Sequence, residues 1–357
     1  GSHTVDLLVE NGYQVVVLDS LKPPTHNGKI PKWLNKKAKL IKGDVREKKD
    51  WQKALRGVEA VVHLAAYMDY HPDFSTYVQT NIESLTILFE IIVEEKLPIK
   101  KIVLASSQAV YGEGKYRCKN HGVMYVSPRA EEQFKRHQWE QFCPKCGKEV
   151  VPVSEKEEDI LFPLAPYGLS KQSSEQFVMA LGKAFSIPAV VLRFSIVLGA
   201  RQSFRHFYSG ALRSFAVNVS NNEPIEMNED GNQLRDFVHV KDVASAILKT
   251  LEDSEANFGT FNVGSGQATR IIDLAKIVAK QSRVAFNPLL QNRYRTGGTR
   301  HSVMNISKLK SLGWKPQRTL QEAVADYILW LSNFKGFHNN LRKTEAEMKK
   351  TGVLKEY

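Results

Sequence analysis

A tyrosine and a lysine four residues apart, Tyr167 and Lys171, are well suited to proton transfer. They follow Pro166, where a helix is predicted to begin. Positions i and i+4 share a helix face, so the Lys171 ammonium is expected beside the phenol. A phenol with a pKa of about 10 is a poor base at neutral pH, and a neighbouring cation favours its ionised form. The pair predicts a phenol that exchanges a proton with a substrate.

Two predicted strand ends carry further polar side chains. Ser107 follows the apolar run 101–106, and its hydroxyl could hold a substrate oxygen whose charge changes during reaction. Asp19 ends the run 13–19, where a carboxylate could bind both hydroxyls of an adenosine ribose and repel a 2′-phosphate, which favours NAD over NADP. Each feature alone is common: turn aspartates and solvated Tyr/Lys pairs are ordinary. Their combination in this order predicts a redox site.

All three cysteines lie close together in the sequence. Cys118 and His121 are separated by two residues, as are Cys143 and Cys146, with 21 residues between the two pairs. This spacing is typical of a closed tetrahedral zinc site, and the alternative is three unrelated buried cysteines and a surface histidine. We favour structural zinc because every cysteine is used. Three cysteines cannot form a disulfide framework, which indicates a reducing compartment, the cytoplasm.

Short β-branched runs alternate with amphipathic stretches. Strands are predicted at 13–19, 38–43, 60–65, 101–106, 189–194 and 259–263, and helices at 3–11, 79–96 and 170–185. This alternation predicts an α/β fold with a doubly wound (Rossmann) parallel sheet. We expect an NAD-binding domain that comprises residues 1–112, 153–200 and 236–264, with a zinc-binding insert at 113–152. A smaller α/β substrate lobe is expected at 201–235 and 265–333. Residues 334–357 form a charged tail, which we predict to be a surface helix.

The sequence opens at Gly1-Ser2-His3 and runs directly into a predicted helix. A dinucleotide site needs a preceding strand and a Gly-rich turn that presents backbone N–H groups to the pyrophosphate. Two explanations stay open. Gly-Ser-His is an expression scar, or Gly1 is the last glycine of the turn and the first strand is missing from this sequence. We favour the second, because a helix and a strand ending in Asp19 follow at once.

Composition excludes several protein classes. The 357 residues are 42% hydrophobic and 25% charged, which excludes a disordered or fibrous chain. The longest charge-free run is too short to span a bilayer, so we expect no membrane partner. The net charge is +12, and residues 29–56 hold 11 Lys/Arg against three acids. That stretch lacks the basic and aromatic alternation of single-strand binders, so we interpret it as a solvated face and expect no nucleic-acid partner.

Together these residues resemble extended short-chain dehydrogenase/reductases of the NAD-dependent epimerase/dehydratase family, which act on nucleotide sugars. The resemblance covers about residues 1–316, and the run from Arg193 to Phe204 with the cysteine insert is most similar to bacterial dTDP-L-rhamnose 4-epimerase-like members. The matching segments are Gly1–His3, Asp19, Gly43–Val45, His63–Ala66, Asn81, Ser106–Gly112, Tyr167 with Lys171, Arg193, Arg235–Val240, Phe261–Gly264 and Arg295–Arg300.

The resemblance implies a ligand set. NAD would be held by Gly1, Asp19, Asp44, Val45, Leu64, Ala65, Ala66, Asn81, Tyr167 and Lys171, and a nucleotide sugar by Ser107, Arg201, Arg235 and Arg295. Arginine suits a diphosphate because its guanidinium donates bidentate bonds, although surface arginines are more common. We expect a homodimer.

One local difference narrows the reaction. Related 4,6-dehydratases carry an Asp-Glu pair just after the hydroxyl residue, whereas this chain has Gln108 and Ala109, which cannot shuttle that proton. The remaining prediction is epimerisation at C4 through a 4-keto intermediate. A net dehydrogenase or reductase, or a non-catalytic nucleotide sensor, are the alternatives. Gly298 replaces an expected aspartate and Ile196 an expected asparagine, so the identity of the sugar stays open.

Overall fold

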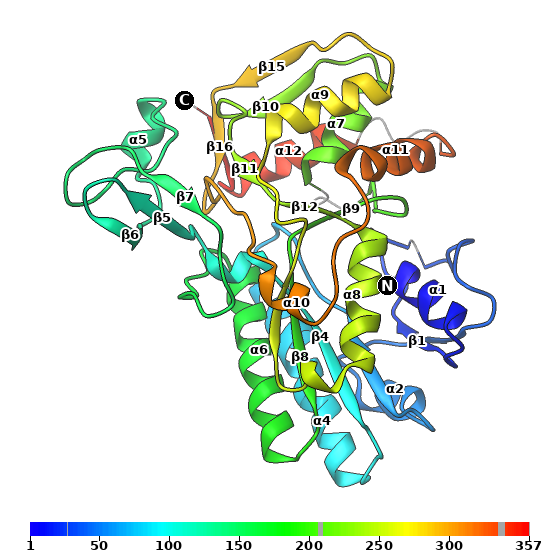
Figure 1. The fold of residues 1–357 in the computed structure, drawn as a ribbon. Coiled ribbons are helices and arrows are strands. Elements are labelled where there is room, and N and C mark those ends of the chain that lie inside the picture. Colours follow the sequence, from blue (N-terminus) through cyan, green and yellow to red (C-terminus); the bar gives the residue numbers. More distant parts are fainter. Residues whose placement is uncertain (27, 206–209, 335–339, 357) are drawn as a thin grey trace.

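The computed structural model describes residues 1–26, 28–205, 210–334 and 340–356. Its centre is a parallel sheet of four strands in the order β13–β8–β4–β3 (Figure 1). Their bounds are β3 Ala60–His63, β4 Lys101–Ser107, β8 Ala189–Phe194 and β13 Thr260–Val263. β4 and β8 are buried along almost their whole length, which explains why their sequences are continuously apolar. The predicted parallel α/β architecture is confirmed.

Helices cover both faces of this sheet (Figure 1). On one face lie α2 Lys48–Ala54, α4 Ser84–Glu94 and α6 Pro166–Ala184, which share an apolar core with β3 and β4. On the other lies α8 Val240–Glu252, against which α1 Ser2–Glu10 packs. The predicted helix at 79–96 is in fact the end of a longer segment that begins with α3 Phe74–Tyr77 and continues through a π-helical stretch, η1 Val78–Glu83.

The parallel strands do not form one continuous sheet. β1 Val16–Asp19 and β2 Lys39–Lys42 pair only with each other among the described residues. β3, in turn, pairs only with β4 in that part of the chain. One edge of β1 and one edge of β3 are therefore without a strand partner within the described ranges.

A second lobe lies beyond the carboxyl ends of the strands (Figure 1). Its core is formed by α7 Gly210–Ser220, α9 Ile271–Gln281 and α11 Leu320–Leu331 together with β10 Ile225–Asn228. β15 Pro288–Gln291 pairs parallel with β10 and is largely exposed. Two pairs of short strands link this lobe to the sheet: β9 Ile196–Leu198 with β12 Phe237–His239, and β11 Leu234–Arg235 with β14 Thr269–Arg270. The turn η3 Ser254–Ala256 follows α8, and α10 Ser307–Ser311 packs against β13.

The charged C-terminal segment is more than a surface helix. It contains α12 Asn340–Lys350, as predicted, followed by β17 Leu354–Glu356. β17 pairs antiparallel with β16 Arg293–Arg295, and Leu354 is buried. The sequence did not predict this strand, because the segment is polar and only one of the three strand side chains is buried.

The cysteine-containing insert projects to one side of the molecule (Figure 1). It leaves the sheet after β4 and the 3₁₀ turn η2 Gln108–Tyr111. It contains the antiparallel strands β5 Lys115–Cys118, β6 Gly122–Tyr125 and β7 Val151–Val153 and the short helix α5 Glu131–Lys135. Its own apolar cluster consists of little more than Tyr116, Val150 and two cysteines, so apolar burial alone stabilises it weakly.

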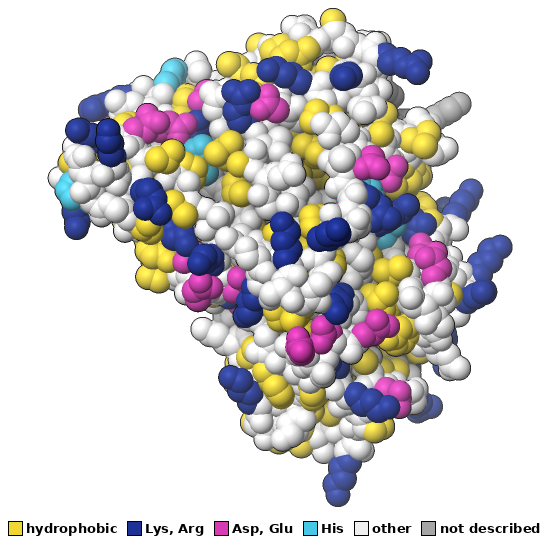
Figure 2. All heavy atoms as spheres, viewed as in Figure 1, with side chains coloured by type: hydrophobic (Ala, Val, Ile, Leu, Met, Phe, Trp, Pro, Cys, Tyr) yellow, Lys and Arg dark blue, Asp and Glu magenta, His cyan; other side chains and the backbone are white. Residues whose placement is uncertain are grey.

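No helix in the described ranges combines the length and apolar character needed to cross a membrane. On the face shown in Figure 2, Lys and Arg side chains are spread among acidic and apolar ones.

A buried carboxyl, Glu155, lies where the insert returns to the sheet. Its backbone N–H donates to Val303 at 2.8 Å, its carbonyl accepts from Asn305 at 2.7 Å, and its Oε2 accepts from the Val303 N–H at 3.0 Å. Gly114 is required beside it, because a Cβ at that position would lie 2.8 Å from Glu155 Oε1 and the backbone has a positive φ. Burial raises the pKa of the Glu155 carboxyl to about 8.

We therefore predict that Glu155→Gln changes how stability depends on pH. In the wild type the folded state holds this proton more tightly than the unfolded state, so the stabilisation is lost as pH rises toward about 8. Urea unfolding between pH 5 and pH 9, a range spanning the raised pKa, should show the wild type losing stability relative to the variant. Glu158→Gln, at an exposed neighbour, is the control. Parallel stability curves for wild type and Glu155→Gln would contradict the prediction.

Candidate active site

The end of β4 and the beginning of α6 meet at the side chains of Ser107 and Tyr167. These two side chains are hydrogen-bonded to each other. Ser107 Oγ also accepts the Ala109 N–H at 3.1 Å, which caps the turn after β4. Pro166 begins α6, and Gly168 lets the helix approach closely, because a Cβ at 168 would lie 2.6 Å from the Ala109 carbonyl oxygen. The predicted Ser107 and Tyr167 are thus in contact.

Lys171 lies one turn further along α6, and its head group is buried. Its Nζ donates to the Ala105 carbonyl oxygen at 2.8 Å, and only 2% of the residue is exposed. Burial lowers the pKa of Lys171 to about 8, against the opposing effect of Glu175. The ammonium is therefore anchored to β4 behind the site.

The expectation that the pKa of Tyr167 is lowered is wrong for this state of the protein. Burial raises the pKa of Tyr167 to about 12, although its hydrogen bond with Ser107 acts in the other direction. The sequence correctly places Lys171 one turn away. However, spacing does not reveal that a backbone carbonyl of β4 takes up the ammonium. Desolvation of the phenol therefore prevails.

A buried ion pair that sequence analysis missed supports this arrangement. Glu175, on α6 one turn beyond Lys171, accepts bidentate bonds from Arg193 of β8, at 2.7 Å to Nη2. Ser106 donates to the same carboxylate. Arg193 also donates to the Tyr111 hydroxyl at 2.9 Å. The only hint of Glu175 in the sequence was its position four residues after Lys171 on the same helix face. Such Glu/Lys spacings are too common in helices to identify a site residue.

Asn81 is a predicted cofactor residue that is almost fully buried. Its amide Nδ2 donates to Ser170 Oγ at 2.8 Å and to the Tyr67 carbonyl at 3.0 Å, and its Oδ1 accepts from the Tyr67 N–H at 2.7 Å. It therefore joins the segment after β3 to α6. Leu64, Ala65 and Ala66 lie in that segment at the carboxyl edge of the sheet.

A pocket lies at the carboxyl end of β1. Gly1 and Asp19 line it together with Trp33, Arg201 and Trp330, and its volume is about 250 Å³. Arg201 was predicted at the substrate, yet in this structure it lines the same pocket as the cofactor candidates Gly1 and Asp19. Its guanidinium is held by Asp6 on α1, whose Oδ2 accepts a hydrogen bond from Arg201 Nη1 at 2.6 Å.

Asp44 and Val45 follow β2, at the same sheet edge. Asp44 accepts bonds from Arg46 Nη2 at 2.7 Å and Lys22 Nζ at 2.6 Å, and hydrogen bonding with Arg46 is the main reason that its pKa is well below the usual range. Val45 is buried, and its carbonyl accepts from the Trp51 indole at 2.7 Å.

The two arginines predicted at a diphosphate differ in how they are used. Arg235 donates to three backbone carbonyls, those of Leu234, Thr299 and Arg300, at 2.6 to 2.9 Å. Arg295 donates through Nη1 to the Tyr70 hydroxyl at 2.9 Å, whereas its buried Nε has no hydrogen-bond partner among the described residues. Arg295 thus retains a donor for an anion, and Arg235 mainly braces the segment around Thr299.

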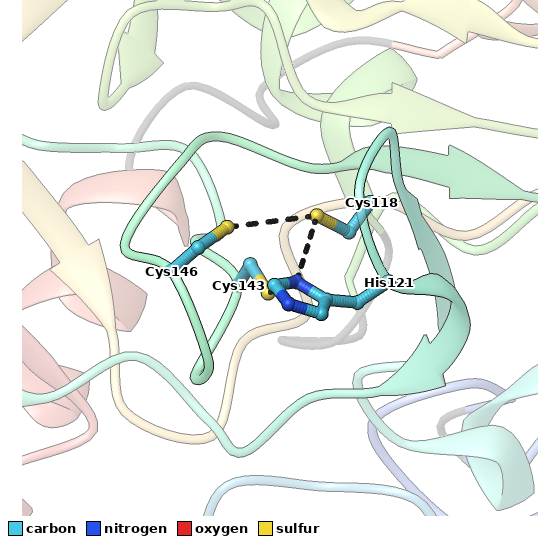
Figure 3. Close-up of side chains that lie close together, drawn as sticks. All are labelled: Cys118, His121, Cys143 and Cys146. Carbon is cyan, nitrogen blue, oxygen red and sulfur yellow. Dashed lines mark hydrogen bonds between the residues drawn. The ribbon is translucent and has the colours of Figure 1, made fainter.

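The four predicted metal ligands converge in the insert (Figure 3). All four ligand atoms of Cys118, His121, Cys143 and Cys146 lie within 4.8 Å of one another. Sγ of Cys118 is 3.7 Å from Sγ of Cys146, and Nδ1 of His121 is 3.4 Å from Sγ of Cys143. Tetrahedral Zn²⁺ with ligands at about 2.3 Å separates two sulfur atoms by about 3.8 Å, so this donor set fits the ion.

Comparison with known proteins gives a consistent assignment. The model of the NAD dependent epimerase/dehydratase family matches residues 1–135 and 141–264. The dTDP-L-rhamnose 4-epimerase of Burkholderia thailandensis is 32% identical over 91% of this chain and 90% of its own length. The structure of Thermotoga maritima UDP-glucose 4-epimerase with UDP-glucose has a TM-score of 0.75 and 26% identity, covering 93% of this chain and 95% of that one.

A second solved structure, the Thermus thermophilus UDP-glucose 4-epimerase complex with NAD, has a TM-score of 0.72 and 25% identity and covers 94% of this chain and 96% of that one. Since the family model spans well over half of the sequence, the chain belongs to the NAD-dependent epimerase/dehydratase family.

Proposed function

We propose that this protein is an NAD-dependent epimerase that inverts C4 of a nucleotide-activated sugar through a transient 4-keto intermediate. The contact between Tyr167 and Ser107 at the carboxyl edge of the parallel sheet carries the proposal. The similarity to a dTDP-L-rhamnose 4-epimerase and to UDP-glucose 4-epimerases supports it.

In this proposal, bound NAD supplies the acceptor and donor of a hydride. Tyr167 removes the proton of the C4 hydroxyl, and Ser107 donates a hydrogen bond to the C4 oxygen as its charge changes. Burial raises the pKa of Tyr167 to about 12, so the ionised phenol needs stabilisation by a positive charge once substrate is bound. We propose that Lys171, one turn along α6, supplies that charge. Returning the proton from Tyr167 completes the cycle.

The residues that follow Ser107 support epimerisation over dehydration. Gln108 is positioned by its Oε1, which accepts from the Ser302 hydroxyl at 3.4 Å, and the Ala109 N–H donates to the capping Ser107 Oγ. Neither side chain can act as an acid or base, so no pair at this position can eliminate water.

The proposal assigns NAD to the edge formed by β1, β2 and β3. Asp19 binds the adenosine ribose, Asp44 and Val45 lie at the adenine, and Gly1 at the start of α1 faces the pyrophosphate. Arg295 binds the diphosphate of the nucleotide sugar through its unpartnered Nε. Because the edges of β1 and β3 are unpaired among the described residues, we propose that one more parallel strand, ending in a Gly-rich turn before Gly1, lies between them.

Tyr167→Phe should abolish turnover while the cofactor stays bound. Loss of the phenolic proton acceptor should lower kcat by at least about 100-fold. Turnover is measured with dTDP-L-rhamnose and UDP-glucose, and bound NAD by denaturing release. Tyr13→Phe, which removes an exposed hydroxyl bonded to Glu252, is the matched control. A Tyr167→Phe variant that keeps its activity would show that Tyr167 is not the base. Net accumulation of NADH by the wild type would indicate a dehydrogenase.

We also propose that the insert binds one structural Zn²⁺ through Cys118, His121, Cys143 and Cys146. A closed set of three thiolates and one imidazole leaves no position for substrate, so the ion supplies folding free energy to a segment with a small apolar cluster. Reduced thiols are required, which supports a cytoplasmic location.

Metal analysis of the reduced protein should find one zinc per chain. His121→Asn should lose most of this zinc and make the segment between residues 113 and 152 sensitive to protease, because a ligand is removed. His137→Asn, at an exposed histidine of the same insert, should keep the ion. A wild-type protein without zinc would exclude the proposed site.

We propose that two copies of the chain form a homodimer through α6 and the neighbouring segment α3–η1, which touch each other. Apolar side chains are exposed on both: Phe74 and Val78 on α3–η1, and Leu169 and Phe177 on α6, at 43% to 61% exposure. Such a patch is expected at an interface. We propose no nucleic-acid partner, because the basic stretch at residues 29–56 lacks the basic and aromatic alternation of single-strand binders.

Phe177→Glu should convert a dimer into a monomer. Light scattering after size exclusion should give about twice the chain mass of 40.4 kDa for the wild type and a single chain mass for the variant. Leu329→Glu, which replaces an apolar residue with 71% exposure on α11, should remain dimeric. A monomeric wild type would contradict the proposal.

A further inference from the structure

We propose that the cysteine insert positions the nucleotide end of the substrate site, by bracing residues 296–302 through Arg129 and Glu140. This inference rests on the proposed function, since it assigns a role in substrate binding to residues outside the reacting centre. Arg129 and Glu140 are positioning residues in this proposal, because they act through the segment that they hold.

Arg129 links the insert to the lobe through buried contacts. Its Nη1 donates to Glu229 at 2.8 Å and to the Trp139 carbonyl at 2.9 Å. Its Nη2 donates to the other oxygen of Glu229 at 3.1 Å and to the Gly298 carbonyl at 3.3 Å. Only 1% of the guanidinium-bearing side chain is exposed. A cation held this way fixes the insert, the lobe and Gly298 relative to one another.

Glu140 provides a second connection, to Arg300 and His301. Its Oε1 accepts from both Arg300 Nε, at 3.1 Å, and Arg300 Nη2, and its Oε2 lies 2.8 Å from His301 Nε2. The Arg300 side chain has no exposed surface and also donates to Glu229 and Asp230. Glu140 is thus one of three carboxylates around a fully buried cation, and it is the one that joins Arg300 and His301 to the insert.

The braced segment reaches both the substrate candidates and the end of β4. Carbonyls of Thr299 and Arg300 hold the Arg235 guanidinium, and Thr299 Oγ1 donates to the Gly112 carbonyl at 3.0 Å. Arg295, with its buried unpartnered Nε, stands just before the segment, and Ser302 donates to Gln108 next to Ser107. Displacement of residues 296–302 would therefore shift the Arg235 guanidinium directly, whereas through Ser302 it reaches Tyr167 by way of Gln108 and Ser107.

The cysteine cluster fixes the part of the insert that carries Glu140. The Val150 N–H donates to the Gln141 carbonyl at 3.0 Å, and the Cys143 N–H to the Lys148 carbonyl at 2.8 Å. These bonds close a hairpin that begins directly after Glu140, and Cys143 and Cys146 lie at its turn. Binding of a metal by these cysteines would order the hairpin and, with it, Glu140.

Glu140→Gln tests the brace. We expect KM for the nucleotide sugar to rise at least about tenfold, because the charge-assisted bonds that tie Arg300 and His301 to the insert are weakened, whereas kcat changes less than about twofold. Zinc and NAD contents should match the wild type. Calorimetric affinity for dTDP and UDP should fall by a similar factor, and amide exchange at residues 296–302 should accelerate. Glu132→Gln, at an exposed acid of α5, is the control.

Two further variants keep the test decisive. Arg129→Lys retains the charge but loses the bidentate bond, so it should also weaken binding of dTDP and UDP. This variant carries the test if Glu140→Gln does not fold. His121→Asn should lower the same affinities through loss of the metal. The inference would be overturned if Glu140→Gln and Arg129→Lys bound dTDP and UDP as tightly as the wild type. It would also be overturned if His121→Asn lost its zinc but kept these affinities. A wild type that binds these nucleotides but epimerises neither sugar would contradict the proposed function alone.

Discussion

The bidentate ion pair between Glu175 and Arg193 is the interaction on which the site depends. It joins the middle of α6 to β8, and through Ser106 and Tyr111 it reaches the end of β4 and the turn that follows. Both partners are buried, so either one alone would leave an uncompensated charge in the core. The pair therefore fixes the register of α6, and Tyr167, about two turns earlier on that helix, meets Ser107 as a result.

Much of the fold could be predicted from the sequence because its strands are short apolar runs. All six predicted strands are present, within a few residues of their expected bounds. The contact of Ser107 with Tyr167 was also predictable, since both lie at ends of elements that share one sheet edge. The pKa of Tyr167 was not, because it depends on burial and on the carbonyl of Ala105, which binds the Lys171 ammonium.

Long-range pairing of charges was the other information that spacing could not supply. Arg201 is bonded to Asp6, and Arg235 is engaged by carbonyls from a segment more than sixty residues away. Motif similarity predicts that such arginines are present, but not which acceptors they meet in the folded chain. The insert shows the same limit: its cysteine spacing predicted a metal site, whereas its buried connections through Arg129 and Glu140 became visible only in three dimensions.

The pairing of β17 with β16 places the end of the chain beside Arg295. Val353 accepts a hydrogen bond from the Thr296 N–H at 2.9 Å, and Leu354 pairs with Arg295 in register. Trimming the last few residues would expose the backbone of β16 as an open sheet edge, where a strand of another molecule could add. Removal of residues 354–356 would thus couple looser seating of Arg295 to a risk of aggregation.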